Sequence, residues 1–243
     1  MQKLYRDHGI VLRTHPLGEA DRIITLLTRG HGKVRAVAKG VRRTGSRFGA
    51  RLEPFGLIDV QLHEGRSLHT VTQVVTIETF AQQITADYAR FTAATAMLET
   101  VDRLSDDVSD PSPRGFLLLV GAMRTMAAGA IPPHLVLDSF LLRSLALAGW
   151  TPSLSDCAAC GVHGPHHAFD VGAGGLVCSA CRRPGAVAVR RSAVEHLILL
   201  LAGDWQNAVR SDDTTVLEAS RLISDMVTWH LERSVRSLGY VER

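Results

Sequence analysis

Cys157-Ala-Ala-Cys160 and, after a seventeen-residue spacer, Cys178-Ser-Ala-Cys181 contain all four cysteines of the chain. Each Cys-x-x-Cys turn presents two thiolates on one side of a tight knuckle, and two knuckles supply a tetrahedron of soft sulfur ligands that suits zinc. Gly161 follows the first pair, where a knuckle often needs a left-handed backbone. The pattern predicts one Zn²⁺ bound by Cys157, Cys160, Cys178 and Cys181 in a hairpin over residues 154–184.

We expect this zinc to be structural, because four thiolates leave no position open for water. Two disulfides or four free thiols are the alternative interpretations, but disulfides belong to oxidising compartments and nothing else marks the chain as secreted. His163, His166 and His167 lie between the knuckles and could replace one cysteine as a ligand, although we interpret them as loop residues. The zinc deaminases place a His-x-Glu motif upstream of their Cys-x-x-Cys, whereas the only His-x-Glu here, residues 230–232, lies downstream.

Length and composition are those of a folded protein with one large domain or two smaller ones. The chain has 243 residues, of which 46% are hydrophobic and 21% charged. The N-terminus lacks the apolar stretch of a signal peptide, and no apolar run approaches the roughly 20 residues of a membrane span. We therefore expect a cytoplasmic, nucleoid-associated protein without membrane contact.

The positive charge is concentrated in the N-terminal third of the chain. Residues 1–80 carry 13 Lys or Arg against 7 Asp or Glu, although the whole chain has a net charge of only +3. Between Arg29 and Arg51 there are eight cations and no acidic residue. Such a block is often simply a solvated face, but this density of unopposed cations favours a polyanion such as nucleic acid.

The first 80 residues predict a small closed β-barrel. Alternating or β-branched segments are separated by turns rich in Gly and Pro. The expected strands are residues 5–14, 21–28, 33–39, 56–63 and 67–78. Five short strands favour an OB-fold, which is the commonest nucleic-acid-binding barrel of this size.

The third expected strand directs its cations outward. Val34, Ala36 and Ala38 would fill the barrel while the alternate residues face out, and the cations continue into the loop from Gly40 to Arg51. The residues expected to contact phosphates are Lys33, Arg35, Lys39, Arg42, Arg43 and Arg47. Few aromatic residues accompany them, so we expect broad, salt-dependent binding of single- and double-stranded DNA rather than sequence reading. For Phe48, stacking on a base and packing against the barrel rim remain equal alternatives.

From residue 81 onward the apolar period becomes helical, and one expected helix face carries Ile84, Tyr88, Phe91, Thr95, Leu98 and Val101. The segments predicted as helices are 81–105, 115–128, 134–148, 192–201 and 213–237, the fourth beginning at a capping box of Ser192 and Glu195. The fold class is therefore α+β and multidomain, with an OB-fold over 1–80 and an all-α domain over 81–243 that carries the zinc hairpin. No P-loop, catalytic triad or paired-carboxylate site can be assembled from the spacing, so we do not expect an enzyme.

Together these parts resemble the bacterial recombination mediators of the RecO family. The resemblance rests on the basic strand and loop over residues 33–47, the cysteine segment with Phe169 and Gly174-Gly175, and the stretch 230–237 (His-Leu-Glu-Arg-Ser-Val-Arg-Ser). It covers nearly the whole chain. Some family members lack the cysteines, so zinc cannot be essential to the common activity.

The resemblance implies a non-enzymatic role in DNA repair and homologous recombination. Members of this family bind single- and double-stranded DNA, anneal complementary strands and act with RecR in the RecF pathway. They assist RecA in displacing single-strand-binding protein. The alternative from the residues alone is another OB-fold and zinc nucleic-acid module, such as an RNA-binding factor.

Overall fold

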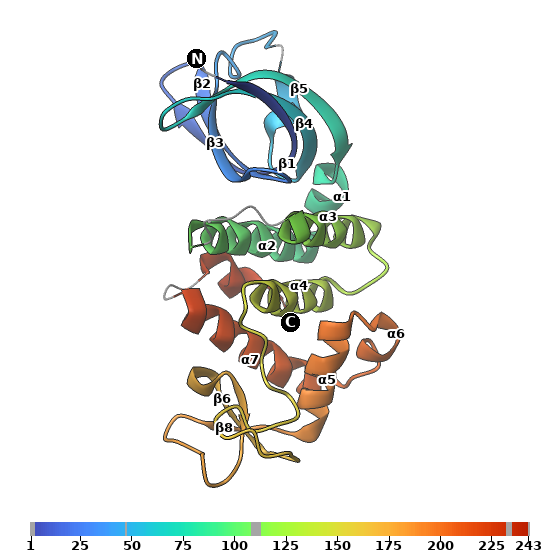
Figure 1. Ribbon diagram of the computed structural model, residues 1–243. Helices are drawn as coiled ribbons and strands as arrows, with labels where there is room; N and C mark the ends of the chain where they lie inside the picture. The colour runs from blue at the N-terminus through green and yellow to red at the C-terminus, as the bar shows by residue number, and fades with distance from the viewer. Residues whose placement is uncertain (1–2, 47, 108–112, 232–234, 243) are drawn as a thin grey trace. The chain divides into compact units, whose positions relative to one another are not determined.

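The computed structural model describes residues 3–46, 48–107, 113–231 and 235–242 (Figure 1). By its internal contacts the chain divides into two compact units, Met1–Ala128 and Gly129–Arg243. The first unit therefore extends beyond the expected barrel boundary at residue 80 and includes three helices. The α+β class, with strands first and helices after, is confirmed.

Five strands form the closed barrel of the first unit, in the order β1-β2-β3-β5-β4 (Figure 1). Their bounds are β1 Leu4–Leu17, β2 Asp21–Thr28, β3 Gly32–Ala38, β4 Gly56–His63 and β5 His69–Thr79. All neighbours pair antiparallel except β3 and β5, which pair in parallel through Ala36 with His69 and Val37 with Thr70. A five-stranded barrel closed by this parallel contact confirms the expected OB-fold.

The barrel interior is filled as the alternation in β3 predicts. Val34, Ala36 and Ala38 are buried, together with Ile24 and Leu26 of the neighbouring strand. Small side chains on β3 suit the narrow interior of a barrel of this size. The segment between β3 and β4, which contains the 3₁₀ helix η1 (Gly49–Leu52), adds further apolar side chains to the same core.

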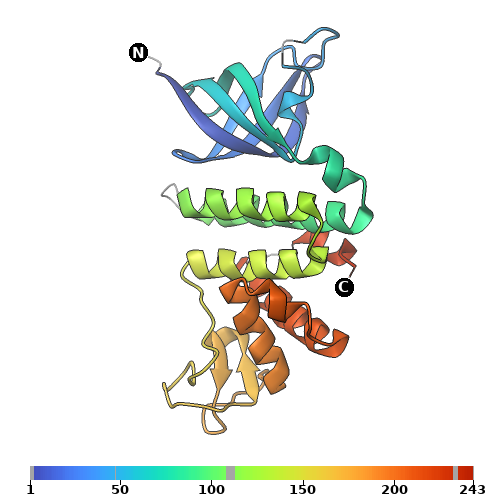
Figure 2. The same ribbon diagram turned by 90° about the vertical axis from the view of Figure 1, so that its right-hand side faces the viewer.

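Three helices complete the first unit. They are α1 Ala81–Thr85, α2 Tyr88–Asp107 and α3 Pro113–Ala128, and α2 contacts both β1 and β3 as well as α3. Figure 2 shows α2 and α3 lying side by side. The continuous helix expected over 81–105 is in fact broken after Thr85. Tyr88 and Phe91, expected on its apolar face, are 60% and 40% exposed.

The second unit is helical, with the cysteine segment between its helices. Its elements are α4 Pro133–Leu147, strands β6 Ala168–Asp170, β7 Gly175–Val177 and β8 Val187–Ala188, the 3₁₀ helices η2 Val171–Ala173 and η3 Arg236–Tyr240, and helices α5 Arg191–Ala202, α6 Trp205–Ala208 and α7 Asp213–Leu231. The three short strands form one sheet in the order β7-β6-β8. The helix η2 connects β6 to β7, and the loop over residues 178–186 connects β7 to β8.

Two expectations about helix ends were wrong. The residue before α5 is Arg190, which makes no side-chain cap, and Glu195 instead forms an ion pair with Arg191, so Ser192 and Glu195 are not a capping box. The last helix was expected to reach Ser237, but α7 ends at Leu231 and Ser237 lies in η3. Residues 232–234, part of the stretch that carried the resemblance, lie outside the described residues. None of the described helices has the length and apolar composition of a membrane span.

Candidate metal centre and nucleic-acid interface

Backbone hydrogen bonds shape the two cysteine knuckles. In the first, the N–H of Gly161 donates to the carbonyl of Cys157 (2.8 Å), and Gly161 has the left-handed φ of 74° that the sequence predicted. In the second, the N–H of Cys181 donates to the carbonyl of Cys178 (3.2 Å). These turns keep each pair of sulfurs on one side of its loop.

The backbone at Gly174 and Gly175, shortly before the second knuckle, pairs with the backbone at Ser153, shortly before the first. Ser153 donates its N–H to Gly174 and accepts from the N–H of Leu176, each at 2.9 Å. A Cβ on Gly175 would lie 2.4 Å from the carbonyl oxygen of Ser153, so no larger residue fits without a backbone shift. Gly175 therefore permits the close approach of the Ser153 backbone, which leads into the first knuckle.

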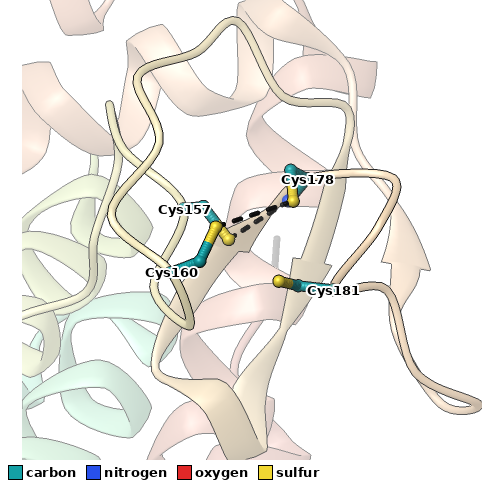
Figure 3. A group of neighbouring side chains, drawn as sticks. All are labelled: Cys157, Cys160, Cys178 and Cys181. Atoms are coloured by element: carbon teal, nitrogen blue, oxygen red, sulfur yellow. Dashed lines mark hydrogen bonds between the residues drawn. The ribbon is translucent and has the colours of Figure 1, made fainter.

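The four sulfur atoms converge on one point. All four lie within 4.8 Å of one another, and Figure 3 shows both pairs directed toward each other. Cys160 Sγ lies 3.8 Å from Cys178 Sγ, and the N–H of Cys178 donates to Cys157 Sγ at 3.4 Å. This donor set fits a metal ion that prefers soft tetrahedral ligands.

The protonation of the thiols is consistent with a site built for a cation. The N–H of Cys178 holds the pKa of the Cys157 thiol at about 6, well below its ordinary value. In contrast, hydrogen bonds to Cys178 and Cys160 raise the pKa of Cys181 to about 12. Sulfurs packed this closely cannot all ionise without a positive charge between them, and a bound divalent cation supplies that charge.

This geometry supports neither disulfides nor a histidine ligand. The four cysteines form no disulfide. Two of the intervening histidines have other partners: His163 Nδ1 lies 2.6 Å from Asp156 Oδ1, and His166 Nε2 lies 2.9 Å from the carbonyl oxygen of Val162. Among the described residues, the ligand cluster contains cysteines alone.

Four of the six residues expected to contact phosphates are exposed on or beside β3. Arg35 and Lys39 point outward from the barrel, and Arg42 and Arg43 follow in the loop. Within the described part of the chain none of these four is in an ion pair with a carboxylate. The fifth residue, Arg47, lies outside the described residues.

Lys33 is the exception among the six. Its side chain is only 10% exposed, and its Nζ lies 2.7 Å from Asp102 Oδ1 on α2. It also donates to the Asp102 carbonyl oxygen. The alternation in β3 correctly predicted that Lys33 points away from the barrel interior. It did not predict that α2, from a distant part of the chain, covers this side chain.

The loop that follows β3 is attached to the turn between β1 and β2. The N–H of Gly40 donates to Asp21 Oδ1 (2.7 Å), and the N–H of Arg42 donates to the carbonyl of Ala20 (2.9 Å). The Arg42 guanidinium also donates to the carbonyl of Gly18 (3.2 Å). This attachment fixes the start of the loop, which carries Arg42 and Arg43, against the turn between β1 and β2.

The aromatic residues of the barrel offer little for base stacking. Phe48 is 2% exposed and belongs to the barrel core, which resolves the alternatives left open for it in favour of packing. Phe55 is also buried. Tyr5 is half-buried, with its hydroxyl 3.1 Å from His69 Nδ1 and its ring against His31. The accessible chemistry of this surface is therefore cationic.

Comparison with known proteins matches both halves of the chain to one family. Residues 1–80 match the family model described as recombination protein O N terminal, and residues 85–239 match recombination protein O C terminal. The chain belongs to the RecO family. It is 58% identical over 240 residues to the DNA repair protein RecO of Thermobifida fusca, with 99% of each chain covered. It is 55% identical over 246 residues to that of Streptomyces griseus, also with 99% of each covered.

Membership of the RecO family places both candidate sites in a DNA repair protein. The family models divide near the end of the barrel, close to the boundary expected from the sequence, whereas the compact units divide after Ala128. The difference arises because α2 packs on the barrel although it belongs to the C-terminal family model. The boundary between the family models thus lies where the strands end and the helices begin. The boundary between the compact units lies after the helices that pack on the barrel.

A second group of arginines flanks the metal centre, and most of its charge is already compensated. Arg183 is bound to Asp170 (3.0 Å), Arg190 to Glu218 and Arg191 to Glu195 (2.8 Å). Salt-bridged guanidinium groups are less available to phosphate than the cations beside β3. These arginines therefore carry less uncompensated charge than the cations beside β3.

Sequence reasoning missed Asp102 and Arg13, which modify the basic surface. Asp102 lies 69 residues after Lys33, and Arg13 Nε is 2.7 Å from its Oδ2. Nothing in the local pattern around Asp102 indicates this contact. The excess of cations over acids in residues 1–80 was the available signal that an acidic group from elsewhere in the chain packs here.

Proposed function

We propose that the chain binds single- and double-stranded DNA by its phosphates, through Arg35, Lys39, Arg42, Arg43 and Arg47. The observation that carries the proposal is the group of exposed cations on β3 and in the following loop, of which the four described are without a carboxylate partner among the described residues. Contacts made to phosphate carry no base information, so the affinity is similar across sequences. Bound cations release counterions, so the affinity falls steeply with salt.

The same surface accounts for annealing of complementary strands. Two single strands repel each other through their phosphates, and cations that bind both backbones reduce this repulsion until base pairing takes over. The step requires neither a nucleotide nor a catalytic residue. The proposed activity is therefore that of a binding protein, not of an enzyme.

As a member of the RecO family, the chain is further proposed to act in the RecF pathway of homologous recombination. RecR and single-strand-binding protein are the proposed direct partners, and RecA and RecF the indirect ones. In this role the chain assists RecA loading onto DNA coated with single-strand-binding protein. The four sulfurs, within 4.8 Å of one another, are proposed to bind one structural Zn²⁺ that fixes the hairpin over 154–184.

The decisive experiment is strand annealing with DNA coated by single-strand-binding protein. The chain is expected to accelerate annealing without ATP, and RecR and RecA are then added to measure RecA loading. Competing RNA tests the alternative of an RNA-binding factor, and labelled DNA with Mg²⁺ tests for cleavage. Preference for RNA, or DNA cleavage that a point substitution in this chain abolishes, would refute the proposal.

A further inference from the structure

A hollow of about 1010 Å³ lies between the cysteine hairpin and α7, within the second unit. The hairpin forms one wall, at Gly172 of η2 and at the turn that contains Pro184. The other wall is α7, from which Asp225, Thr228 and Trp229 line the hollow. Its volume is at the upper end of the range for ligand pockets, so it has room for more than one side chain of a bound molecule.

Trp229 supplies most of the accessible apolar surface of the hollow. The residue is 60% exposed, although one edge of its ring lies against the backbone of η2. A Cβ on Gly172 would lie 3.2 Å from Cζ2 of Trp229, so glycine permits this close approach. Val187 on β8 also lines the hollow and is exposed. An indole ring held at one edge and open to solvent is typical of a surface that binds another molecule.

The hollow carries one uncompensated negative charge. Two of its charged residues neutralise each other, because Arg183 Nε lies 3.0 Å from Asp170 Oδ2. Asp225 lies four residues before Trp229, so its carboxylate and the indole ring are neighbours on one helix face. Within the part of the chain that the structure describes, this carboxylate forms no ion pair or hydrogen bond, not even with Arg221 one turn earlier.

We propose that this hollow binds an arginine side chain on a segment of a partner protein, and that Asp225 and Trp229 recognise it. A guanidinium group is planar, so it can stack on an indole ring while its edge donates hydrogen bonds to a carboxylate. The spacing of Asp225 and Trp229 on α7 places both groups beside the same point of the hollow. The hydroxyl of Thr228 can accept a further hydrogen bond, and Val187 offers contact to an apolar neighbour of the arginine.

The charge of the hollow argues against a nucleic-acid strand as its occupant. An exposed tryptophan can also stack on an unpaired base. The phosphates of that strand would, however, approach the carboxylate of Asp225, while Arg183 is already bound to Asp170. An arginine side chain neutralises the uncompensated charge, whereas a nucleic-acid strand adds to it. The inference therefore goes beyond the DNA surface of the barrel and does not depend on it.

The test is a titration of the full chain with the peptide acetyl-Leu-Arg-Leu-amide, followed by the NMR signals of the indole N–H groups. The chain has three tryptophans, and the signal of Trp229 is the one that is missing from Trp229→Leu. We expect this signal to shift and to saturate, and the signal of Trp205 on α6 to stay in place. The same peptide with citrulline in place of arginine keeps the shape without the charge and should bind on the order of tenfold more weakly.

Variants of the two recognising residues should each weaken binding of the arginine peptide. Asp225→Asn removes the ion pair, and we expect a loss of about two- to fivefold. Trp229→Leu removes the cation–π contact and should cost a similar factor of about two to five, measured from the backbone N–H signal of Thr228. The matched control is Asp213→Asn, which makes the same change in charge on the same helix about 18 Å away. It should bind the peptide as the wild type does.

The outcomes decide between the possible occupants. Equal binding of the arginine and citrulline peptides, or undiminished binding by Asp225→Asn, would overturn the inference. It would also be overturned if the arginine peptide left the wild type unchanged while Trp229→Leu lost affinity for single-stranded DNA, because the hollow would then stack on bases. Arg42→Ala/Arg43→Ala should leave peptide binding unchanged, so a failure of the proposed DNA surface and a failure of this inference give different results.

Discussion

Cys160 Sγ of the first knuckle lies 3.8 Å from Cys178 Sγ of the second, although 17 residues separate the two motifs. The hairpin over residues 154–184 contains strands of only three residues each, and the buried cluster beside the cysteines consists of Cys157, Ala168 and Val177. So small an apolar cluster adds little stability to the loops that carry the cysteines. The four sulfurs lie close enough together to hold a metal ion, and the proposed Zn²⁺ would add the stability that this cluster lacks.

Replacement of one ligand should release the metal. Cys178→Ser removes one of four thiolates, so we expect bound zinc to fall from about one per chain toward zero and the hairpin to become sensitive to protease. Elemental analysis of protein purified without chelator measures the first effect and limited proteolysis the second. Ser179→Ala, a change within the same knuckle that removes no ligand, should keep the metal. Wild-type protein without zinc would contradict the assignment.

Phe48 should act on stability rather than on DNA binding. Because its ring is 2% exposed in the barrel core, Phe48→Ala should cost about 3–5 kcal/mol of unfolding free energy. Phe48→Leu, which keeps most of the apolar volume, should cost clearly less. Urea denaturation of the three proteins gives the comparison. A stable Phe48→Ala variant with selectively weakened single-strand binding would instead indicate a stacking role.

The ion pair between Arg6 and Asp59 should make barrel stability depend on pH. Two hydrogen bonds of 2.7 Å from Arg6 lower the pKa of the Asp59 carboxyl. A lowered pKa in the folded state stabilises the fold above the unfolded value of about 3.9, and this stabilisation is lost as the pH falls through the folded-state pKa. Arg6→Gln should therefore lower the urea midpoint at pH 7, with the deficit shrinking toward pH 3.

The control for this prediction removes a charge without removing an ion pair. Arg66→Gln changes an exposed arginine of the β4–β5 loop that has no carboxylate partner among the described residues. It should give nearly the same midpoint as the wild type at both pH values. A deficit for Arg6→Gln that grows as the pH falls would have the wrong sign for a carboxylate with a lowered pKa.

Much of the fold followed from local sequence. The alternation of Val34, Ala36 and Ala38 with charged residues indicated the third strand and its inner face, and the strand over Gly56–His63 was predicted to the residue. The four cysteines could be assigned as a cluster because their spacing alone determines two knuckles. These features depend on residues close together in the chain.

The features that sequence reasoning missed depend on contacts between distant segments. The contact of Asp102 with Lys33 requires α2 to pack on the barrel. The backbone helix is broken between α1 and α2, although the helical spacing of apolar residues in the sequence continues through this point. Likewise, Tyr88 and Phe91 have the helical spacing of the predicted apolar face, but their side chains are exposed rather than buried. Tertiary packing, which a local pattern does not encode, decided each of these cases.

The most direct test of the central claim is the salt dependence of DNA binding by Arg42→Ala/Arg43→Ala. If these residues bind phosphates, the slope of log K against log salt should flatten by about 1.4–1.8, because two phosphates are no longer neutralised. Random-sequence single strands and duplexes should weaken alike, because phosphates carry no base information. Arg210→Ala/Arg221→Ala, which removes two exposed arginines from the second unit, is the matched control and should keep the slope. An unchanged affinity and slope for Arg42→Ala/Arg43→Ala would contradict the account and place the DNA surface elsewhere.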